Sequence, residues 1–390
     1  MMKMTDRAGS YLSSSAAGEH YRTFIPHPLP PKPPLQIDAV QYNIMEKAHV
    51  ALGRLDGLAA LLPDKSLILY HSIRKEAILS SQIEGTQSSL SDLLLHESDE
   101  APGVPLEDVQ EVSNYIAAIN HGMTRLRSGF PISLRLIREI HEILLSKGRG
   151  RNKMPGEFRR SQNWIGGTRP GNARFVPPPP EKVMSCMGDL EKFLHLDDIP
   201  ILTKAALAHV QFETIHPFLD GNGRVGRLLI TLILCAENML SEPLLYTSLY
   251  FKTHRQMYYD HLEKVRTNGD WEGWLRFFYE GILEAAEHTA NASRSILSLV
   301  EKDRQRIESL GRPAITALRL HQLLQKKPII SAPKGAIELG LTRPTVAQAL
   351  EHLQRLKIVR EFTDRARNRL YIYDKYVKIM SADTEPIREV

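Results

Sequence analysis

The segment from His216 to Arg227, HPFLDGNGRVGR, contains the residues of this chain best suited to chemistry. Its histidine suits a general base, because imidazole titrates near neutral pH. Its carboxylate, Asp220, is the hard oxygen ligand that a divalent cation prefers among phosphates. Its glycines let backbone N–H groups approach anionic oxygens, and its arginines offer planar donors that match phosphate. The segment therefore predicts a site for a magnesium-bound polyphosphate.

The flanking residues predict how the phosphates would be held. Residues 201–215 (ILTKAALAHVQFETI) have apolar side chains at helical spacing, and residues 227–238 (RLLITLILCAEN) indicate a buried helix. The glycine-rich loop then leads into a helix N-terminus, where free N–H groups and the helix dipole favour an anion. Arg224 and Arg227 are expected on one face of its first turn, because their spacing brings them together.

Two other interpretations of the segment compete with the phosphate site. Gly221, Gly223 and Gly226 match the GxGxxG pattern of dinucleotide-binding proteins, but that pattern needs a preceding strand, and the preceding residues look helical. The second is that DGNG is a tight turn whose neighbouring arginines pair with surface carboxylates. The residues taken together favour the phosphate site over both.

The segment resembles the signature of Fic-domain proteins, H-x-F-x-[DE]-G-N-G-R-x-x-R, and meets every defined position. The resemblance implies an all-α Fic core that transfers AMP from ATP to a Ser, Thr or Tyr hydroxyl of a target protein or of the chain itself. It implies that His216 deprotonates this hydroxyl, that Asp220 holds Mg²⁺, and that Phe218 anchors the loop in the core. The residues that it implies for phosphate binding are Gly221, Asn222, Gly223, Arg224 and Arg227.

A second motif lies upstream. Residues 80–85, SSQIEG, match [ST]-x-x-x-E-[GN], the autoinhibitory signature of many Fic proteins, and end a helical pattern that Gly85 would stop. The resemblance implies that Glu84 pairs with Arg227 and keeps ATP from its reactive position, with Ser80 and Gly85 as further regulatory residues. The alternative is that Glu84 is a solvated residue at a helix end.

A flap is expected beside the phosphate site. Residues 156–180 are rich in Gly, Pro and Arg, and residues 163–165 and 174–176 predict two short strands of a β-hairpin. Fic proteins carry such a flap, which holds the target segment by backbone pairing. A plain surface loop is the alternative.

The base of a nucleotide would need a contact of its own. Residues 249–259 (LYFKTHRQMYY) place Tyr250, His254 and Tyr258 at four-residue spacing, so one helical face could meet an adenine. His254 is the candidate for a polar nucleotide contact. Packing in the core is the alternative for the two tyrosines.

Composition favours a cytoplasmic enzyme of two or three domains, since the chain has 390 residues and no N-terminal segment like a signal peptide. The longest apolar run is too short to cross a bilayer, so no membrane association is expected. Two cysteines cannot build a disulfide framework, and no CxxC or HExxH spacing indicates zinc. The predicted parts are an N-terminal helical region with the inhibitory helix (1–110), the Fic core (111–265), a helical connector (266–310) and a winged-helix-like domain (311–390).

Basic residues gather in the last of these parts. Residues 311–380 contain 14 Lys and Arg but 5 Asp and Glu, a net charge of +9 in a chain of net +5. Such segregation is typical of nucleic-acid binding. Helices are predicted over 314–324, 332–339 and 343–356, with a basic strand over 365–373, an order that resembles the winged helix-turn-helix appended to many Fic proteins.

The third of these helices would be the recognition helix. Thr342 is its candidate N-cap, and Arg343, Thr345 and Gln348 would face a DNA groove. The alternative is that this domain mediates protein contacts or homodimer formation. A second function therefore stays open: a DNA-binding transcription regulator that uses the Fic fold as an ATP-sensing scaffold.

Overall fold

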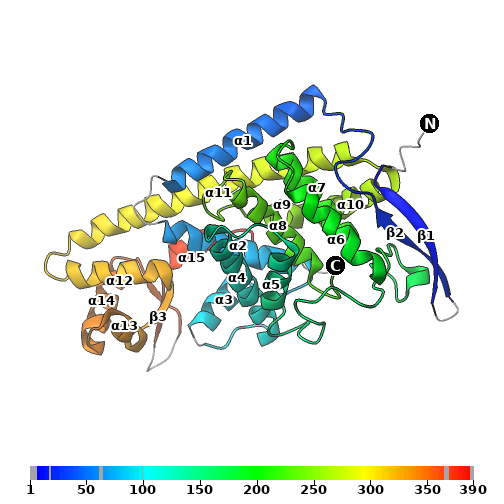
Figure 1. Ribbon diagram of the computed structural model, residues 1–390. Coiled ribbons are helices and arrows are strands. Elements are labelled where there is room, and N and C mark those ends of the chain that lie inside the picture. Colours follow the sequence, from blue (N-terminus) through cyan, green and yellow to red (C-terminus); the bar gives the residue numbers. More distant parts are fainter. Residues whose placement is uncertain (1–6, 17–18, 61–64, 99, 364–368, 387–390) are drawn as a thin grey trace.

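The structure is a computed structural model that describes residues 7–16, 19–60, 65–98, 100–363 and 369–386. These residues are mostly helical, with two small antiparallel sheets at opposite ends of the molecule (Figure 1). The predicted helical core is therefore confirmed. Within the described ranges, no helix combines the length and the apolar character that crossing a membrane requires.

The helices in chain order are α1 (Ala39–Ala60), α2 (Ser66–Ile83), α3 (Leu90–Glu97), α4 (Leu106–Arg127), α5 (Leu134–Leu144), a short 3-10 turn (Pro170–Asn172), α6 (Pro180–Leu194), α7 (Ile201–Ile215), α8 (Asn222–Ala236), α9 (Ser248–Thr253), α10 (Arg255–Asn268), α11 (Trp271–Glu308), α12 (Ala314–Lys326), α13 (Ala332–Leu339), α14 (Arg343–Arg355) and α15 (Asp374–Ser381). The strands are β1 (Gly9–Ala16), β2 (Glu19–Pro26), β3 (Ile329–Ser331), β4 (Arg360–Glu361) and β5 (Leu370–Ile372).

Helices α7 and α8 form the centre of the bundle. Every residue of α7 from Leu202 to Ile215 is buried, including the polar residues Lys204, His209 and Glu213. Helices α2, α4, α5, α6, α10 and α11 pack around this pair. The loop between α7 and α8, which carries the HPFLDGNGR motif, is therefore held between two buried helices.

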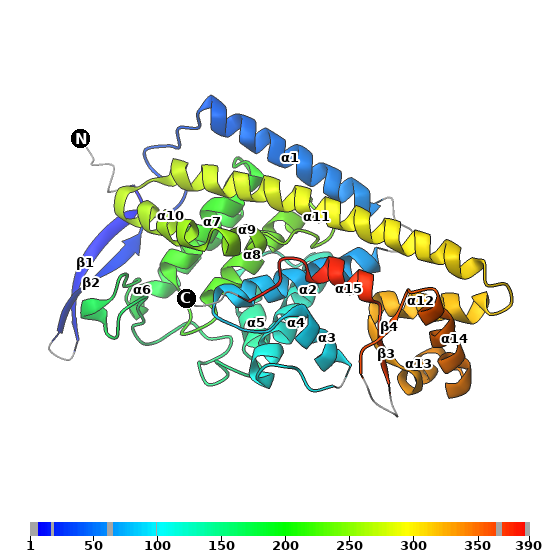
Figure 2. The ribbon, with the colours of Figure 1, turned by 180° about the vertical axis from the view of Figure 1, so that it is seen from behind.

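Helices α1 and α11 lie side by side along one face of the bundle (Figures 1 and 2). Helix α11 is 38 residues long and begins with Asp270 as its N-cap, whose side chain accepts a hydrogen bond from Gly273 N at 3.0 Å. It runs from the bundle to the small C-terminal unit, so it connects the two parts of the molecule.

An N-terminal β-hairpin, β1–β2, precedes the helices within the predicted N-terminal region (1–110). A two-stranded ribbon is marginal on its own, so it needs a surface to pack on. Phe24 supplies that contact: its side chain is buried, and its backbone N–H donates to Val176 O at 2.9 Å. The sequence does not predict this hairpin, because its first strand, GSYLSSSA, is rich in serine and has few side chains that favour β-strands.

The C-terminal unit contains α12, α13 and α14 together with a three-stranded sheet in the order β3-β5-β4. The three predicted helices are confirmed, and Thr342 caps α14 by accepting a hydrogen bond from Thr345 N at 3.4 Å. Part of the predicted basic strand, residues 365–368, lies outside the described residues. Its remainder includes β5.

Candidate active site

The motif loop begins where α7 ends at His216, which adopts a left-handed backbone conformation with φ 49°. Arg159 fixes this corner, because its Nε donates to His216 O at 2.9 Å. At the other end of the loop Gly221 has φ 76° and precedes α8, a conformation that glycine adopts without steric cost. The two ends of the loop meet at one place, since His216 and Gly223, in the first turn of α8, line the same cavity.

Asn222 and Phe218 shape the loop from within. The Asn222 side chain accepts from Phe218 N and donates to Phe218 O, both at 2.9 Å, so its amide is engaged by the loop backbone. Phe218 is fully buried and stacks on the ring of His141 with 3.6 Å between centroids. Phe218 thus lies in the core, as the resemblance implied, while direct contact of Asn222 with an anion stays a prediction.

His141 on α5 is a supporting residue that the sequence analysis missed. Its Nδ1 accepts from Gly156 N at 2.9 Å and its Nε2 lies 3.0 Å from Asp220 O, a pattern that requires the neutral ring with its proton on Nε2. Burial lowers the pKa of His141 to about 4, which keeps the ring neutral. His141 therefore fixes both Phe218 and the backbone of Asp220.

His216 lies at the edge of a cavity with its side chain 21% exposed. Burial, together with the positive charges of Arg266 and Arg159, lowers the pKa of His216 to about 3, so the imidazole is neutral at physiological pH. Its Nδ1 lies 3.8 Å from Glu213 Oε2 and has no hydrogen-bond partner among the described residues. Burial raises the pKa of Glu213 to about 7.

Arg227 is buried and is held by the end of α2. Its Nη2 donates to Glu84 Oε1 at 2.6 Å and to Ser80 O at 2.9 Å, and its Nε donates to Ser80 Oγ at 3.0 Å. Helix α2 stops at this point because Gly85 follows with φ 95°. A Cβ on Gly223 would collide with Glu84 Oε1, so the carboxylate fills the space directly over the start of α8.

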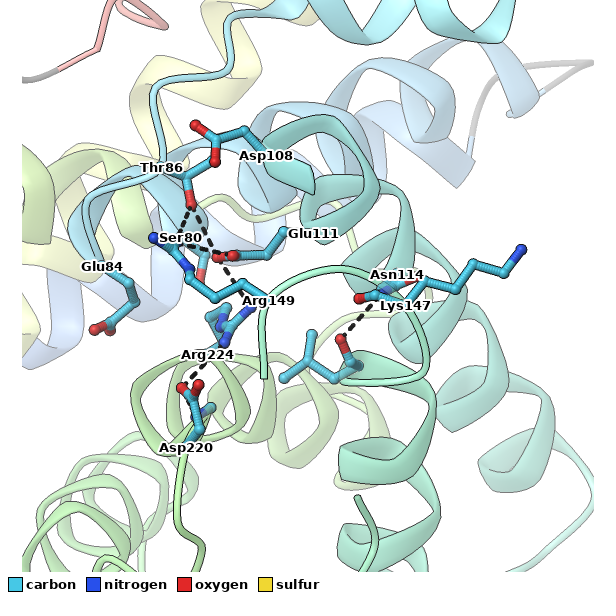
Figure 3. Close-up of polar contacts among 12 residues, drawn as sticks. Ser80, Glu84, Thr86, Asp108, Glu111, Asn114, Lys147, Arg149, Asp220 and Arg224 are labelled. Carbon is cyan, nitrogen blue, oxygen red and sulfur yellow. Dashed lines mark hydrogen bonds and ion pairs between the residues drawn. The ribbon is translucent and has the colours of Figure 1, made fainter. Parts of the chain in front are cut away.

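Arg224 points to a different carboxylate (Figure 3). Its Nη1 lies 2.9 Å from Oε1 of Glu111, a buried residue of α4, and its Nη2 lies 3.5 Å from Asp220 Oδ1. Glu111 also accepts from Thr86 Oγ1 at 2.8 Å and from Arg149 Nη2 at 2.9 Å. The two arginines of the motif therefore leave α8 toward separate acidic partners.

A cavity of about 530 Å³ opens beside the motif, a size within the range of small-molecule sites. Of the predicted site residues, Glu84, His216, Gly223 and Arg227 line it, whereas Asp220, Gly221, Asn222, Arg224 and His254 do not. Its other lining residues come from β1, the flap, α7 and α10, and they are Tyr11, Trp164, Ile165, Gly166, Arg174, Phe175, Glu213, Arg255, Tyr258, Tyr259, Leu262, Glu263, Arg266 and Thr267.

The predicted flap is present in reduced form. Ile165 and Phe175 make one antiparallel bridge, with N···O distances of 2.8 and 3.1 Å, in place of two full strands. Phe175 packs on Phe24 of the N-terminal hairpin, with 6.0 Å between ring centroids, and Arg266 lies over its ring at 4.0 Å. The flap is thus supported by β2 and α10, and the flap, β1 and α10 together form the outer wall of the cavity.

Of the three residues predicted to share one helical face, Tyr258 lines the cavity, whereas Tyr250 and His254 do not. His254 stands between α9 and α10, where its backbone, with φ −108° and ψ 37°, departs from helical geometry. The His254 ring lies against Tyr250, with 4.3 Å between centroids, and away from the cavity lining. Arg255 and Tyr259 of α10 line the cavity together with Tyr258.

The C-terminal segment after α15 also reaches the SSQIEG segment at the end of α2, a contact that no sequence signal indicated. Gln82, within SSQIEG, donates from Nε2 to Thr384 O at 2.8 Å and to Ser88 O at 2.9 Å. Asp383 lies 3.7 Å from Lys75 of α2. The end of α2 is therefore packed between α8 on one side and the end of the described chain on the other.

Asp220 is the residue best placed to hold a metal ion. Its side chain is 36% exposed, and its Oδ1 accepts from Gly221 N at 2.6 Å. The described residues contain no group of three or more His, Cys, Asp or Glu side chains arranged to hold an ion. Mg²⁺ is commonly bound by one or two carboxylates, with phosphate oxygens and waters completing its shell. The donor set thus fits a Mg²⁺ that arrives with a nucleotide.

The sequence matches two family models. Residues 42–124 match the Fic/DOC family N-terminal region, and residues 131–234 match the Fic/DOC family domain. The chain is 29% identical over 249 residues to a protein adenylyltransferase Fic from Culex quinquefasciatus, covering 62% of this chain and 46% of that protein. It is 32% identical over 215 residues to that of Aedes aegypti, covering 54% of this chain and 38% of that protein. It therefore spans less than half the length of these relatives.

Solved structures show a similar fold. A Fic family protein from Desulfovibrio desulfuricans G20 superposes with a TM-score of 0.57 at 21% identity, over 87% of this chain and 98% of that one. A Fic domain containing signaling protein from Bacteroides thetaiotaomicron superposes with a TM-score of 0.51 at 20% identity, over 65% of this chain and 97% of that one. The helical bundle around α7 and α8 thus matches known Fic folds.

Proposed function

Because this chain is a member of the Fic/DOC family, we propose that it is a protein adenylyltransferase, which transfers AMP from ATP to a Ser, Thr or Tyr hydroxyl of a target protein or of itself. The observation that carries the proposal is the meeting of His216, Gly223 and Arg227 around one cavity at the start of α8. The relatives named protein adenylyltransferase support it.

His216 is the general base of the proposed reaction. It takes the proton of the target hydroxyl while the hydroxyl oxygen forms a bond to the α-phosphorus of ATP and the bond to pyrophosphate breaks. The neutral ring supports this role, since only a neutral imidazole can accept a proton. A bound polyphosphate brings negative charge close to the ring, which raises the pKa of His216 toward the range in which a general base is effective.

The phosphates are bound by the start of α8 and by its arginines. The free N–H groups and the dipole of a helix start stabilise an anion, and guanidinium groups offset the charge that develops in phosphoryl transfer. Mg²⁺ held by Asp220 supplies further neutralisation of the phosphate charge when it is bound. We assign the β- and γ-phosphates to Arg224 and Arg227, and the outer wall with the flap to the target segment.

Glu84 is the autoinhibitory residue in this proposal. Its carboxylate occupies the anion position over Gly223 and pairs with Arg227, so it competes with the terminal phosphate of ATP. The position of Glu84 at the end of α2, with its side chain 35% exposed, supports a contact that can open.

A label-transfer assay with α-³²P-ATP and Mg²⁺ tests the function. The protein with Glu84→Gly is expected to label hydroxyl-bearing residues strongly, and addition of His216→Ala is expected to abolish the label. His195→Ala serves as the control, because this histidine is exposed at the end of α6. Undiminished labelling by the His216→Ala protein would contradict the assignment of the base.

The C-terminal unit supports a second candidate function, DNA binding by a winged helix. Its net charge of +9 over residues 311–380, and the exposed positions of Arg343 and Gln348 on α14, favour a nucleic-acid partner. A gel shift with duplex DNA tests this, and affinity that falls linearly with the logarithm of salt concentration is the expected result. Absence of a shift at low salt would leave protein contact as the role of this unit.

A further inference from the structure

We infer that Arg149 is a third phosphate-binding arginine of the nucleotide site and that Glu111 is the residue that positions it. The inference rests on the proposed function and adds a residue outside the HPFLDGNGR motif. Arg149 belongs to the loop between α5 and α6, and Glu111 belongs to α4. Neither residue attracted attention in the sequence, because charged residues on loops and amphipathic helices are usually solvated.

The loop before Arg149 is hydrogen-bonded to α4. Asn114 Nδ2 donates to Leu144 O at 3.2 Å and to Lys147 O at 2.9 Å (Figure 3). At Gly148, with φ 76°, a Cβ would lie 3.2 Å from the carbonyl oxygen of Glu107. Helix α4 therefore fixes the backbone that leads into Arg149.

The Arg149 side chain is fastened to the same helix, one turn away. Its Nη2 donates to Glu111 Oε2 at 2.9 Å and to Thr86 Oγ1 at 3.2 Å. Glu111 lies three positions before Asn114 on α4, so both residues face the loop. The Arg149 side chain is nevertheless 51% exposed, whereas that of Glu111 is 2% exposed. One end of the guanidinium is held, and the group remains open to solvent and hence to a ligand.

The position of the loop places Arg149 beside the proposed metal ligand. A Cβ on Gly150, which has φ 88°, would lie 2.9 Å from Asp220 Oδ2. Figure 3 shows Arg149 and Arg224 meeting at Glu111, with Asp220 on the far side of Arg224. Arg149 therefore belongs to the side of the site where Asp220 and Arg224 lie, opposite the Glu84 contact.

Charge and unsatisfied donors at this place point to an anion. Arg149 and Arg224 share the carboxylate of Glu111, and Asp220 lies 3.5 Å from Arg224, so this place gains an excess of positive charge once Asp220 holds a cation. Nε and Nη1 of Arg224 are buried and form no hydrogen bond with the described residues, although Nη1 lies close to Glu111. Buried donors without acceptors are costly, so a ligand that brings several anionic oxygens would satisfy both needs. The polyphosphate of ATP has that chemistry, whereas AMP carries no β- or γ-phosphate.

Nucleotide binding without turnover tests the inference. A parent protein carrying Glu84→Gly and His216→Ala would be titrated with ATP, ADP and AMP in the presence of Mg²⁺ by isothermal calorimetry. Arg149→Gln in this parent is expected to weaken ATP and ADP binding about tenfold, because a charge-assisted contact is lost, and to leave AMP binding unchanged. Arg149→Lys, which keeps the charge, is expected to recover most of the ATP affinity.

Arg151→Gln is the matched control, since Arg151 is an exposed residue of the same loop and loses the same charge. A merely structural role of Arg149 predicts that ATP, ADP and AMP are weakened equally, with a lower unfolding temperature, and this result would overturn the inference. Unchanged ATP affinity in the Arg149→Gln protein would overturn it as well. Either of these results leaves the proposed function intact, provided that the parent binds ATP and the protein with Glu84→Gly alone transfers label. If the parent binds no nucleotide, the inference and the proposed function both fail.

Discussion

The two arginines of the motif lie three residues apart on α8, yet their acidic partners differ in how readily they can move away. Arg227 pairs with Glu84, the residue at which α2 ends, whose side chain is 35% exposed. Arg224 pairs with Glu111, which lies within α4 and is 2% exposed. Glu84 has one arginine partner, whereas Glu111 also holds Arg149 and Thr86.

The comparison shows how one helix start can carry both a removable and a permanent contact. Glu84 can leave Arg227 if the last turn of α2 frays, and water then solvates its carboxylate. Glu111 can leave only if α4 moves. Its departure would leave the guanidinium groups of Arg224 and Arg149 unpaired and partly buried. We therefore regard the Arg227–Glu84 pair as the regulatory contact and the Arg224–Glu111 pair as part of the permanent architecture of the site.

The largest expected effect is on stability. Glu111→Gln removes the charge that compensates Arg224 and Arg149, so the free energy of unfolding is expected to fall by about 3–5 kcal/mol, as for other broken buried ion pairs. Urea denaturation measures this change. Glu107→Gln, at an exposed position on the same helix, is the control and is expected to change little. If Glu111→Gln lowers the free energy of unfolding by less than about 1 kcal/mol, the Arg224–Glu111 pair is no more permanent than the Arg227–Glu84 pair.

The Glu84 contact is expected to control activity more than stability. Glu84→Gly should raise the rate of label transfer about 10- to 100-fold, because one charge-assisted contact that competes with ATP is lost. Glu84→Gln, which keeps the volume of the side chain, should raise it in the same direction. Glu46→Gly on the exposed face of α1 controls for the glycine itself. Equal rates for wild type and both Glu84 variants would refute the clamp.

A smaller effect is expected from Thr86, which connects the end of α2 to the permanent pair through Glu111. Thr86→Val removes the hydrogen bond to Glu111, worth about 1 kcal/mol, together with the longer one from Arg149, so label transfer should rise by roughly fivefold as α2 opens more often. In a Glu84→Gly background the same substitution should have no further effect. Thr124→Val, at an exposed threonine of α4, is the control. Additive effects of the two substitutions would contradict a shared opening.

The smallest expected effect concerns pH. Burial raises the pKa of Glu84, but Arg227, with Arg224 and His216, outweighs burial and holds this pKa below its ordinary value of 4.5. A carboxyl whose pKa is lowered in the folded protein stabilises its contact fully at any pH above its unfolded pKa. This stabilisation is lost only as the pH falls through the folded pKa. The ratio of label transfer between Glu84→Gly and wild type should therefore be constant from pH 6 to pH 8. A ratio that declines steadily toward pH 6 would mean that the contact titrates in that range.

The sequence was informative wherever a signal is local. The bounds of α7 and α13 follow from apolar periodicity and from flanking Pro, Ser or Gly residues. The stop of α2 follows from Gly85, since glycine tolerates the conformation that ends the helix. The motif itself is contiguous, so its residue types and spacing could be read directly, and the match to the Fic/DOC family domain includes it.

Other features were decided by contacts between residues far apart in the chain. Glu111, Arg149 and His141 support the motif, but on their own helix or loop they look like ordinary charged or polar residues. That Tyr258 lines the cavity while Tyr250 and His254 do not depends on how α9 and α10 pack in the bundle.

By itself, then, the sequence determined which groups could handle a nucleotide, because chemistry is set by residue type and by spacing along a helix. Only the tertiary structure decided which carboxylate each arginine meets, that Gln82 reaches Thr384, and that β2 supports the flap. The physical reason is that the cost of burying a charge or a backbone donor depends on the partner that packing supplies, and sequence separation carries no information about that partner.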